Sequence, residues 1–190
     1  MIDTLAQFLF REVYRFRDLV VRGDLDLILI KPINPLIRVL LGGADILDLF
    51  ILILIAIILF LFGINNITTN LFHWFLYLLL IANGLIIAAA FHIFVLGFGI
   101  TTTSIDHLVL FYRDMSSMLR IPVDLYTQPI RLILTFLIPL GLMITLPAKA
   151  LMNLVSPDFV IVSFLIGSCL FWLSLKYWNF CLKQYTSASS

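Results

Sequence analysis

"ILDLFILILIAIILFLFGI", residues 46–64, carries one charged residue, Asp48, in nineteen positions. As an α-helix it would rise roughly 28 Å, close to the hydrocarbon thickness of a bilayer, about 30 Å. The stretch therefore predicts a membrane-spanning helix. The two carboxylates at its start, Asp45 and Asp48, could serve proton or metal chemistry. The reading we favour is that they flank a helix N-terminus, where the helix dipole favours negative charge.

The whole chain has the composition of an integral membrane protein. Its 190 residues are 62% hydrophobic and 12% charged, and the mean hydropathy is +1.12. Soluble domains are about half apolar and about a quarter charged. With a net charge of +1, the sequence lacks the excess of positive charge that is typical of nucleic-acid-binding proteins. His73 and His92 are nineteen residues apart in one apolar segment, too far apart on a helix to share a metal, and no metal site is predicted.

Three further apolar segments predict three more spans. They are residues 72–99, residues 131–146, which are short and interrupted by Pro139, and residues 159–178. A shallow re-entrant element follows the third span in "PAKALMNLVSP", and residues 104–120, with Ser104 as a possible N-cap, predict a surface helix. The expected fold is all-α, a polytopic membrane protein with four transmembrane helices and cytosolic interfacial helices. We divide it into a cytosolic element (1–45), a transmembrane domain (46–180) and a disordered tail (181–190).

Residues 4–21, "TLAQFLFREVYRFRDLVV", have apolar side chains at helical spacing with charges between them. The cationic and aromatic character suits a helix lying on the membrane surface. An amphipathic helix packed on protein explains the pattern equally well, and the sequence leaves both open.

The lysines and arginines predict the orientation of the four spans. Four crossings place residues 1–45, 100–130 and 179–190 on one side, and residues 65–71 and 147–157 on the other. With Arg131 and Lys176 assigned to the nearer side, eleven of the twelve cations lie on the first side and only Lys149 on the second. Because cytosolic loops are enriched in lysine and arginine, both termini are predicted to be cytosolic.

Polar residues inside the predicted spans are candidates for a transport pathway, since ionisable or polar groups at membrane depth are often functional. Asn83 and His92 are the two that we select, although such residues are more often hydrogen-bonded packing groups. In the last span, Ser163 and Gly167 form a small-xxx-small pattern. It can serve a dimer interface or packing within the chain, and both interpretations stay open.

"VRGDLDLILIKPINPL", residues 21–36, predicts a short helix on the cytosolic side. Gly23 permits a sharp turn and Pro32 ends the helix. Leu25, Ile28 and Leu29 could then face a groove on a soluble partner. The alternative is that Asp24 and Asp26 merely keep a loop soluble.

Two patches resemble a branch of the ATP-binding-cassette type-2 (ABC-2) permeases. Residues 22–36 resemble the family pattern R/x-G-x-L-D-x-x-L-x-x-P-x-x-P-L, and residues 121–152, "IPVDLYTQPIRLILTFLIPLGLMITLPAKALM", resemble its P-x-x-x-Y…R-x-x-L-T-F-x-x-P…P-A segment. The resemblance implies ATPase-coupling residues at Arg22, Gly23, Asp24, Leu25, Asp26, Lys31 and Pro32. It implies a re-entrant element near the outer face at Pro139, Pro147 and Ala148.

The resemblance also implies a function. The chain would be the permease subunit of an exporter in a prokaryotic plasma membrane. It would pair with a second permease copy and work by alternating access, driven by a separate ATPase subunit that binds ATP and Mg. No G-x-x-x-x-G-K-[ST] loop is present, so we expect no cofactor on this chain.

Members of this family usually have six spans, two of them before the R-G-x-L-D element. The chain is therefore expected to be a fragment of a longer permease or a four-span variant. A non-transporting membrane partner or assembly subunit is the alternative function. An intramembrane enzyme is disfavoured because neither H-E-x-x-H nor G-x-S-x-G occurs.

Overall fold

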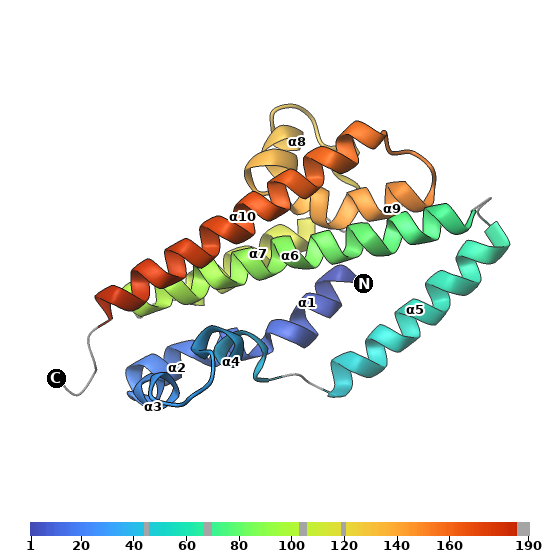
Figure 1. Cartoon of the computed structure of the whole chain (residues 1–190). Coiled ribbons are helices and arrows are strands. Elements are labelled where there is room, and N and C mark those ends of the chain that lie inside the picture. The colour runs from blue at the N-terminus through green and yellow to red at the C-terminus, as the bar shows by residue number, and fades with distance from the viewer. Residues whose placement is uncertain (44–45, 67–69, 103–105, 119–120, 186–190) are drawn as a thin grey trace.

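The computed structural model describes residues 1–43, 46–66, 70–102, 106–118 and 121–185, and the regular structure in these ranges is all helix (Figure 1). The chain order is α1 (Ile2–Phe10), η1 (Arg11–Arg15), α2 (Phe16–Val21), α3 (Asp24–Leu29), α4 (Pro35–Leu41), α5 (Ile46–Asn66), α6 (Leu71–Thr102), α7 (Asp106–Met118), η2 (Val123–Leu125), α8 (Ile130–Leu132), η3 (Ile133–Leu137), η4 (Gly141–Thr145), α9 (Leu146–Leu151) and α10 (Pro157–Gln184). In this part of the chain, α5, α6 and α10 are long and apolar enough to cross a membrane, which confirms three predicted spans.

Helices α6 and α10 form the centre of the molecule and run parallel to each other. Asn83 of α6 lies beside Ser163 near the start of α10, and further along, the rings of Phe94 and Tyr177 are 5.6 Å apart. Figure 1 shows the two helices side by side. Both helices therefore begin at the same end of the molecule. The chain between them, residues 103–156, has to return along the full length of α6.

That return is shared between two elements. Helix α7 covers the later part of α6, where the rings of Tyr112 and Phe91 stack at 4.7 Å. Met143 of η4 then packs near Gly84, and α9 continues toward the start of α6. Residues 130–137 and 141–151 form a helix pair bent by 78°, which is either a fourth, broken span or a re-entrant loop. The bend agrees with the predicted short, interrupted segment at 131–146 and the re-entrant element after it. Helix α7 lies within the helix predicted at 104–120. The possible N-cap, Ser104, lies outside the described residues.

An ion cluster corrects the predicted sides of two loops. Asp124 Oδ1 accepts from Arg131 Nη2 at 2.7 Å, and Asp124 Oδ2 lies 2.5 Å from Lys149 Nζ. The positive-inside count had placed residues 100–131 and residue 149 on opposite sides of the membrane. Side chains in direct contact share one side, so that division is wrong for the segment around Asp124.

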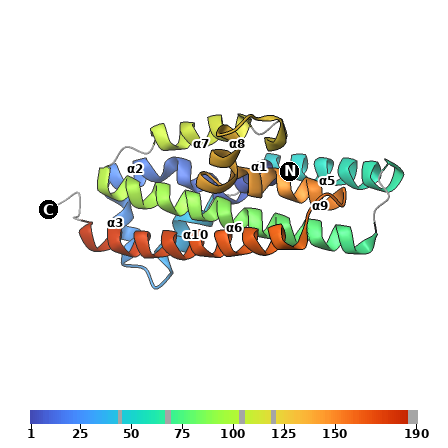
Figure 2. The same ribbon diagram turned by 90° about the horizontal axis from the view of Figure 1, so that it is seen from above.

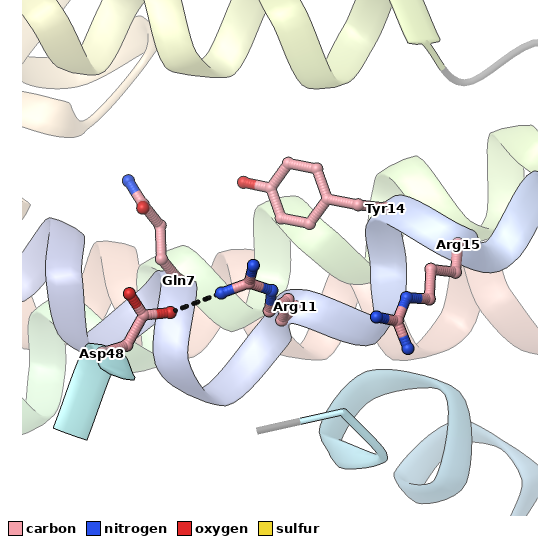
Figure 3. A pocket seen from close by; sticks show the side chains of 5 residues that line it. All are labelled: Gln7, Arg11, Tyr14, Arg15 and Asp48. Atoms are coloured by element: carbon pink, nitrogen blue, oxygen red, sulfur yellow. Dashed lines mark hydrogen bonds and ion pairs between the residues drawn. The ribbon is translucent and has the colours of Figure 1, made fainter. Parts of the chain in front are cut away.

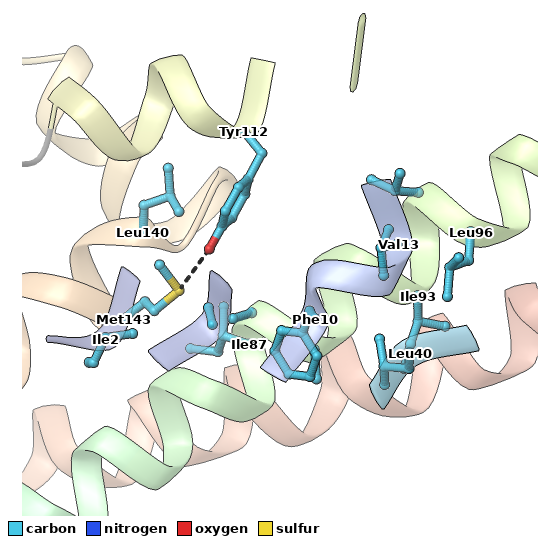
Figure 4. Packing of buried hydrophobic residues seen from close by; sticks show 14 of the residues in the cluster. Ile2, Phe10, Val13, Leu40, Ile87, Ile93, Leu96, Tyr112, Leu140 and Met143 are labelled. Atoms are coloured by element: carbon cyan, nitrogen blue, oxygen red, sulfur yellow. Dashed lines mark hydrogen bonds between the residues drawn. The ribbon is translucent and has the colours of Figure 1, made fainter. Parts of the chain in front are cut away.

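The N-terminal helices pack on α6, which confirms the second interpretation of residues 4–21. The ring of Phe10 lies 5.0 Å from that of His92, and Val13 and Phe16 are fully buried. Figure 4 shows Phe10 and Val13 on the N-terminal helices beside α6. The buried positions are spaced by four residues up to Phe10, then by three through Val13 to Phe16. The 3₁₀ turn η1 accounts for the change, because side chains three residues apart align at three residues per turn.

Helix α5 stands apart from the other spans (Figure 1). Only 11% of its residues 46–63 are buried inside the chain, so most of its apolar surface is left for lipid or another protein. It contacts α1, and Arg11 Nη1, at the start of η1, lies 3.0 Å from Asp48 Oδ2. Asp48 is therefore ion-paired as well as being near the helix N-terminus. Asp45 lies outside the described residues.

The predicted tail begins too early. Residues 181–184 are the last turn of α10, and Cys181 is fully buried. The boundary at residue 180 is therefore wrong, and residues 186–190 lie outside the described part of the chain.

Candidate partner-docking element

The element spans residues 21–41 and consists of the end of α2, helix α3 and helix α4. Gly23 separates α2 from α3 with φ 77° and ψ 6°, a left-handed conformation that glycine adopts without the steric cost of a Cβ. The turn redirects the chain, so that α3 lies beside α2 at one end of the bundle (Figure 1). This is the sharp turn that the sequence predicted.

The end of α3 and the start of α4 are also set locally. Helix α3 ends at Leu29, three residues before Pro32. Asn34 then caps α4: its side-chain oxygen accepts from the amides of Leu36 at 3.0 Å and Ile37 at 3.4 Å. Pro35 occupies the first helical turn, where its missing N–H costs nothing. The result is a short helix held between two fixed turns.

The apolar side chains of α3 divide differently from the prediction. Leu25 is fully buried, whereas Leu27 and Ile30 are 56% and 78% exposed. Leu25 therefore anchors the element to the rest of the fold, and the prediction that it faces a partner is wrong. The exposed apolar side chains of the element are Val21, Leu27, Ile30, Ile33, Ile37 and Leu41.

The charged residues of the element divide in the same way. Arg22, Asp24, Lys31 and Pro32 are exposed beside the apolar side chains. Asp26 is half-buried and acts on Tyr185 at the end of α10. Burial, and then the Asp26 carboxyl, raise the pKa of the Tyr185 phenol above its usual value. Asp26 therefore lies close to Tyr185, the residue that follows the membrane-spanning helix α10.

A second polar feature lies where the N-terminal helices meet α5 (Figure 3). A cavity of about 370 Å³ is lined by Gln7, Arg11, Tyr14, Arg15 and Asp48. The Arg11–Asp48 ion pair crosses it. This site was not predicted from the sequence, but it had a signal: Gln7, Arg11 and Arg15 recur every four residues and share one face of the N-terminal segment.

The two pathway candidates serve packing inside the chain. Asn83 Nδ2 donates to the Ser163 carbonyl at 3.1 Å and to Ser163 Oγ at 2.8 Å, which joins α6 to α10. His92 Nδ1 bonds the Ala88 carbonyl at 2.8 Å, and its ring lies 5.0 Å from that of Tyr112. Both side chains are almost fully buried. The structure does not bring them together, and a role in a pathway stays a prediction.

The residues of the predicted re-entrant element lie in the bent pair. Pro139 occupies the bend between η3 and η4. Pro147 and Ala148 lie in α9 and line an apolar cavity of about 270 Å³ with Tyr77 of α6. The bend and its proline agree with the expected interruption of the apolar segment.

The Ser163–Gly167 pattern packs within the chain. Gly167 is buried against Asn83, and a Cβ on Gly167 would overlap Asn83 Oδ1. The small side chains therefore allow α10 to approach α6 closely, and the interpretation as intrachain packing is confirmed.

Comparison with known proteins gives one match, to a protein family. No curated protein and no solved structure matches the chain. The family model described as ABC-2 family transporter protein matches residues 1–189. With its apolar helices and its bent helix pair, the chain is a membrane protein that belongs to the ABC-2 transporter family.

Proposed function

We propose that this chain is the permease subunit of an ABC exporter, and that a separate ATPase subunit binds the docking element. The observation that carries the proposal is the exposure of Leu27, Ile30 and Ile33 on a capped, well-defined element. Apolar side chains of this kind suit the core of a protein interface, with charges such as Arg22 and Lys31 at its rim. In this proposal the ATPase, and not this chain, binds ATP and Mg.

The element has two routes by which movement of an ATPase could reach the spans. Asp26 acts on Tyr185 at the end of α10. The ring of Phe16 in α2 lies 6.3 Å from that of Trp178 in α10. A nucleotide can shift the access equilibrium only through different affinities for the two states. These contacts are the places where such a difference would be transmitted to the membrane domain.

The docking proposal is tested with two matched variants. Leu27→Asp combined with Ile30→Asp places two carboxylates on exposed side chains of the element and keeps the buried anchor Leu25. Leu154→Asp is the control, because Leu154 is 67% exposed in the turn before α10, at the opposite end of the molecule. We expect the double variant to insert normally, to lose co-purification with the partner ATPase, and to lose transport. The control should keep both.

Unchanged ATPase binding in the double variant would refute the docking proposal. Wild-type protein that never co-purifies with an ATPase would favour the non-transporting membrane partner instead.

We also propose that both termini are cytosolic. Six of the twelve lysines and arginines lie in residues 1–45, and this segment ends in the docking element. The test is thiol labelling from outside intact cells, in a variant whose native cysteines are replaced. Cysteines introduced at Asn66 and Gln128 should react, and a cysteine at Lys183 should not. Labelling at Lys183 would reverse the topology, and protection of Gln128 would refute an outer position for the segment around Asp124.

A second permease copy is part of the proposed exporter. Gly167 packs against Asn83 within the chain. We therefore assign the contact between the two permease copies to the exposed apolar face of α5. Cross-linking between cysteines placed at Leu54 in two copies should give a dimer in membranes. A strictly monomeric protein in lipid nanodiscs would contradict the assignment.

A further inference from the structure

The ion cluster of Asp124, Arg131 and Lys149 has more positive than negative charge. Each oxygen of Asp124 faces one cation, Arg131 at 2.7 Å and Lys149 at 2.5 Å. Both oxygens of the single carboxylate are thus paired, and the cluster of two cations and one anion has a net charge of +1. Arginine has five N–H donors and lysine has three, and no second acidic partner of either cation is found among the described residues. The cluster can therefore accept one more anion.

The cluster opens into a cavity of about 370 Å³. One part of its wall is polar, with Gln128 and Thr135 beside the cations. The other part is apolar, formed by Leu132, Phe136, Leu146 and Phe159. Phe136 and Phe159 meet edge to face, with ring centroids 6.1 Å apart. A ligand that fills this cavity would meet charge at one end and aliphatic or aromatic surface at the other.

The position of the cavity narrows the class of ligand. Phe159 lies in the first turn of α10, so the cavity sits at the end of that span and at the opposite end from the docking element. The neighbouring apolar side chains Leu132, Phe136 and Leu137 are exposed. At the end of a membrane span, this combination puts the cations at the depth of lipid headgroups and the exposed apolar side chains at the depth of acyl chains.

We propose that this cavity binds an anionic amphiphile, with the phosphate or carboxylate held by Arg131 and Lys149 and the chain lying along Phe136 and Leu132. The site uses residues of this chain alone and does not depend on the ATPase proposal. Asp124 sets its affinity, because its carboxylate neutralises one of the two cations.

Native mass spectrometry of the full chain in a non-ionic detergent tests the site. Phosphatidylglycerol is the anionic probe, and phosphatidylcholine with the same acyl chains is the uncharged comparison. Wild type should retain phosphatidylglycerol preferentially, and Lys149→Gln should weaken that retention by about fivefold, as for the loss of one partly exposed charge contact. Lys183→Gln, at the exposed end of α10, is the matched control and should change nothing.

Competition identifies the source of the anion. Dodecyl phosphate should displace phosphatidylglycerol, and inorganic phosphate at the same concentration should not. If inorganic phosphate displaces phosphatidylglycerol, the ligand is a small anion and the proposal of an amphiphile is refuted. Equal retention of both lipids by wild type would overturn the site altogether.

A second variant separates ligand binding from a purely structural ion cluster. Asp124→Asn removes the internal anion and leaves two cations facing the cavity. Under the proposal it strengthens retention of phosphatidylglycerol, whereas Lys149→Gln weakens it. If the cluster only clamps residues 121–131 onto α9, both variants loosen the same contact and change lipid retention in the same direction. That outcome would refute the proposal.

Discussion

Replacing Gly167 with alanine tests the packing of the two central helices. The new Cβ would overlap Asn83 Oδ1 and lie 3.2 Å from Asn83 Cγ. The amide of Asn83 is held by its two hydrogen bonds to Ser163, one turn earlier on α10. Because both contacts are made with the same helix, the amide cannot move away from residue 167 without giving up a hydrogen bond.

The expected cost follows from two opposing effects. Overpacking a tight interface by a methyl group costs about 1–3 kcal/mol. Replacing glycine by alanine within a helix gains about 0.5–1 kcal/mol. Gly167→Ala should therefore destabilise the protein by up to about 2.5 kcal/mol in the wild-type background. In an Asn83→Ala background the obstructing amide is gone, and the same change should stabilise the protein by about 0.5–1 kcal/mol.

The measurement is a double-mutant cycle on the free energy of unfolding, with SDS as denaturant in mixed micelles and tryptophan fluorescence as the signal. The helix-propensity gain occurs in both backgrounds and cancels, so the coupling energy isolates the contact between residues 83 and 167. Ser168→Thr is the control, since it adds one methyl group at the neighbouring exposed position, and it should change stability by less than about 0.5 kcal/mol.

The result that would refute this reasoning is an equal stabilisation by Gly167→Ala in both backgrounds. If Gly167→Ala instead abolishes dimers and leaves the free energy of unfolding unchanged, Gly167 lies at a subunit interface.

Three further outcomes follow from burial and charge. Leu25→Ala should lower the free energy of unfolding by about 2–5 kcal/mol in the same SDS titration, because a fully buried leucine side chain is removed. Leu27→Ala should change it little. Equal losses for the two variants would contradict the orientation of α3. Arg11→Gln should destabilise by no more than about 1 kcal/mol, since its ion pair to α5 is partly exposed, and Arg15→Gln is the matched control without effect. The raised pKa of Tyr185 means that the folded chain keeps its phenol protonated more tightly than the unfolded chain. The contribution of Tyr185 to stability should therefore be constant below pH 10 and fall above it, and Tyr185→Phe should remove that part of the fall.

The long apolar helices were predictable because their signal is carried by composition alone. A stretch of nineteen residues with one charge has the length and the apolar character of a membrane-spanning helix, and residues 46–64 lie in α5 as expected. The same holds for α6 and α10. Their ends were placed less well, since the last turn of α10 contains polar residues such as Lys183 and Gln184 and is fixed by the burial of Cys181.

The orientation of α3 was not predictable. A helical face is read from the alternation of polar and apolar positions, and residues 27–30 are apolar without a break. Any of them could have faced the fold. The choice of Leu25 as the buried anchor depends on where Gly23 redirects the chain, which is a tertiary effect. The contact of Asp124 with Lys149 was not predictable for a related reason, because it depends on the direction in which the chain bends between residues 130–137 and 141–151.

The N-terminal helices show why amphipathicity alone did not locate them. The pattern of residues 4–21 states that one face is apolar and the other polar, and both a membrane surface and a packed bundle satisfy it. In the structure, the apolar face packs on α6, and the polar face turns toward the start of α5. The charge of α5 nearest to that face, Asp48, is paired with Arg11. An isolated carboxylate at the end of an apolar helix and an arginine on an amphipathic one are each unremarkable in sequence. Their pairing fixes which way the N-terminal segment faces, and with it the position of the docking element that follows.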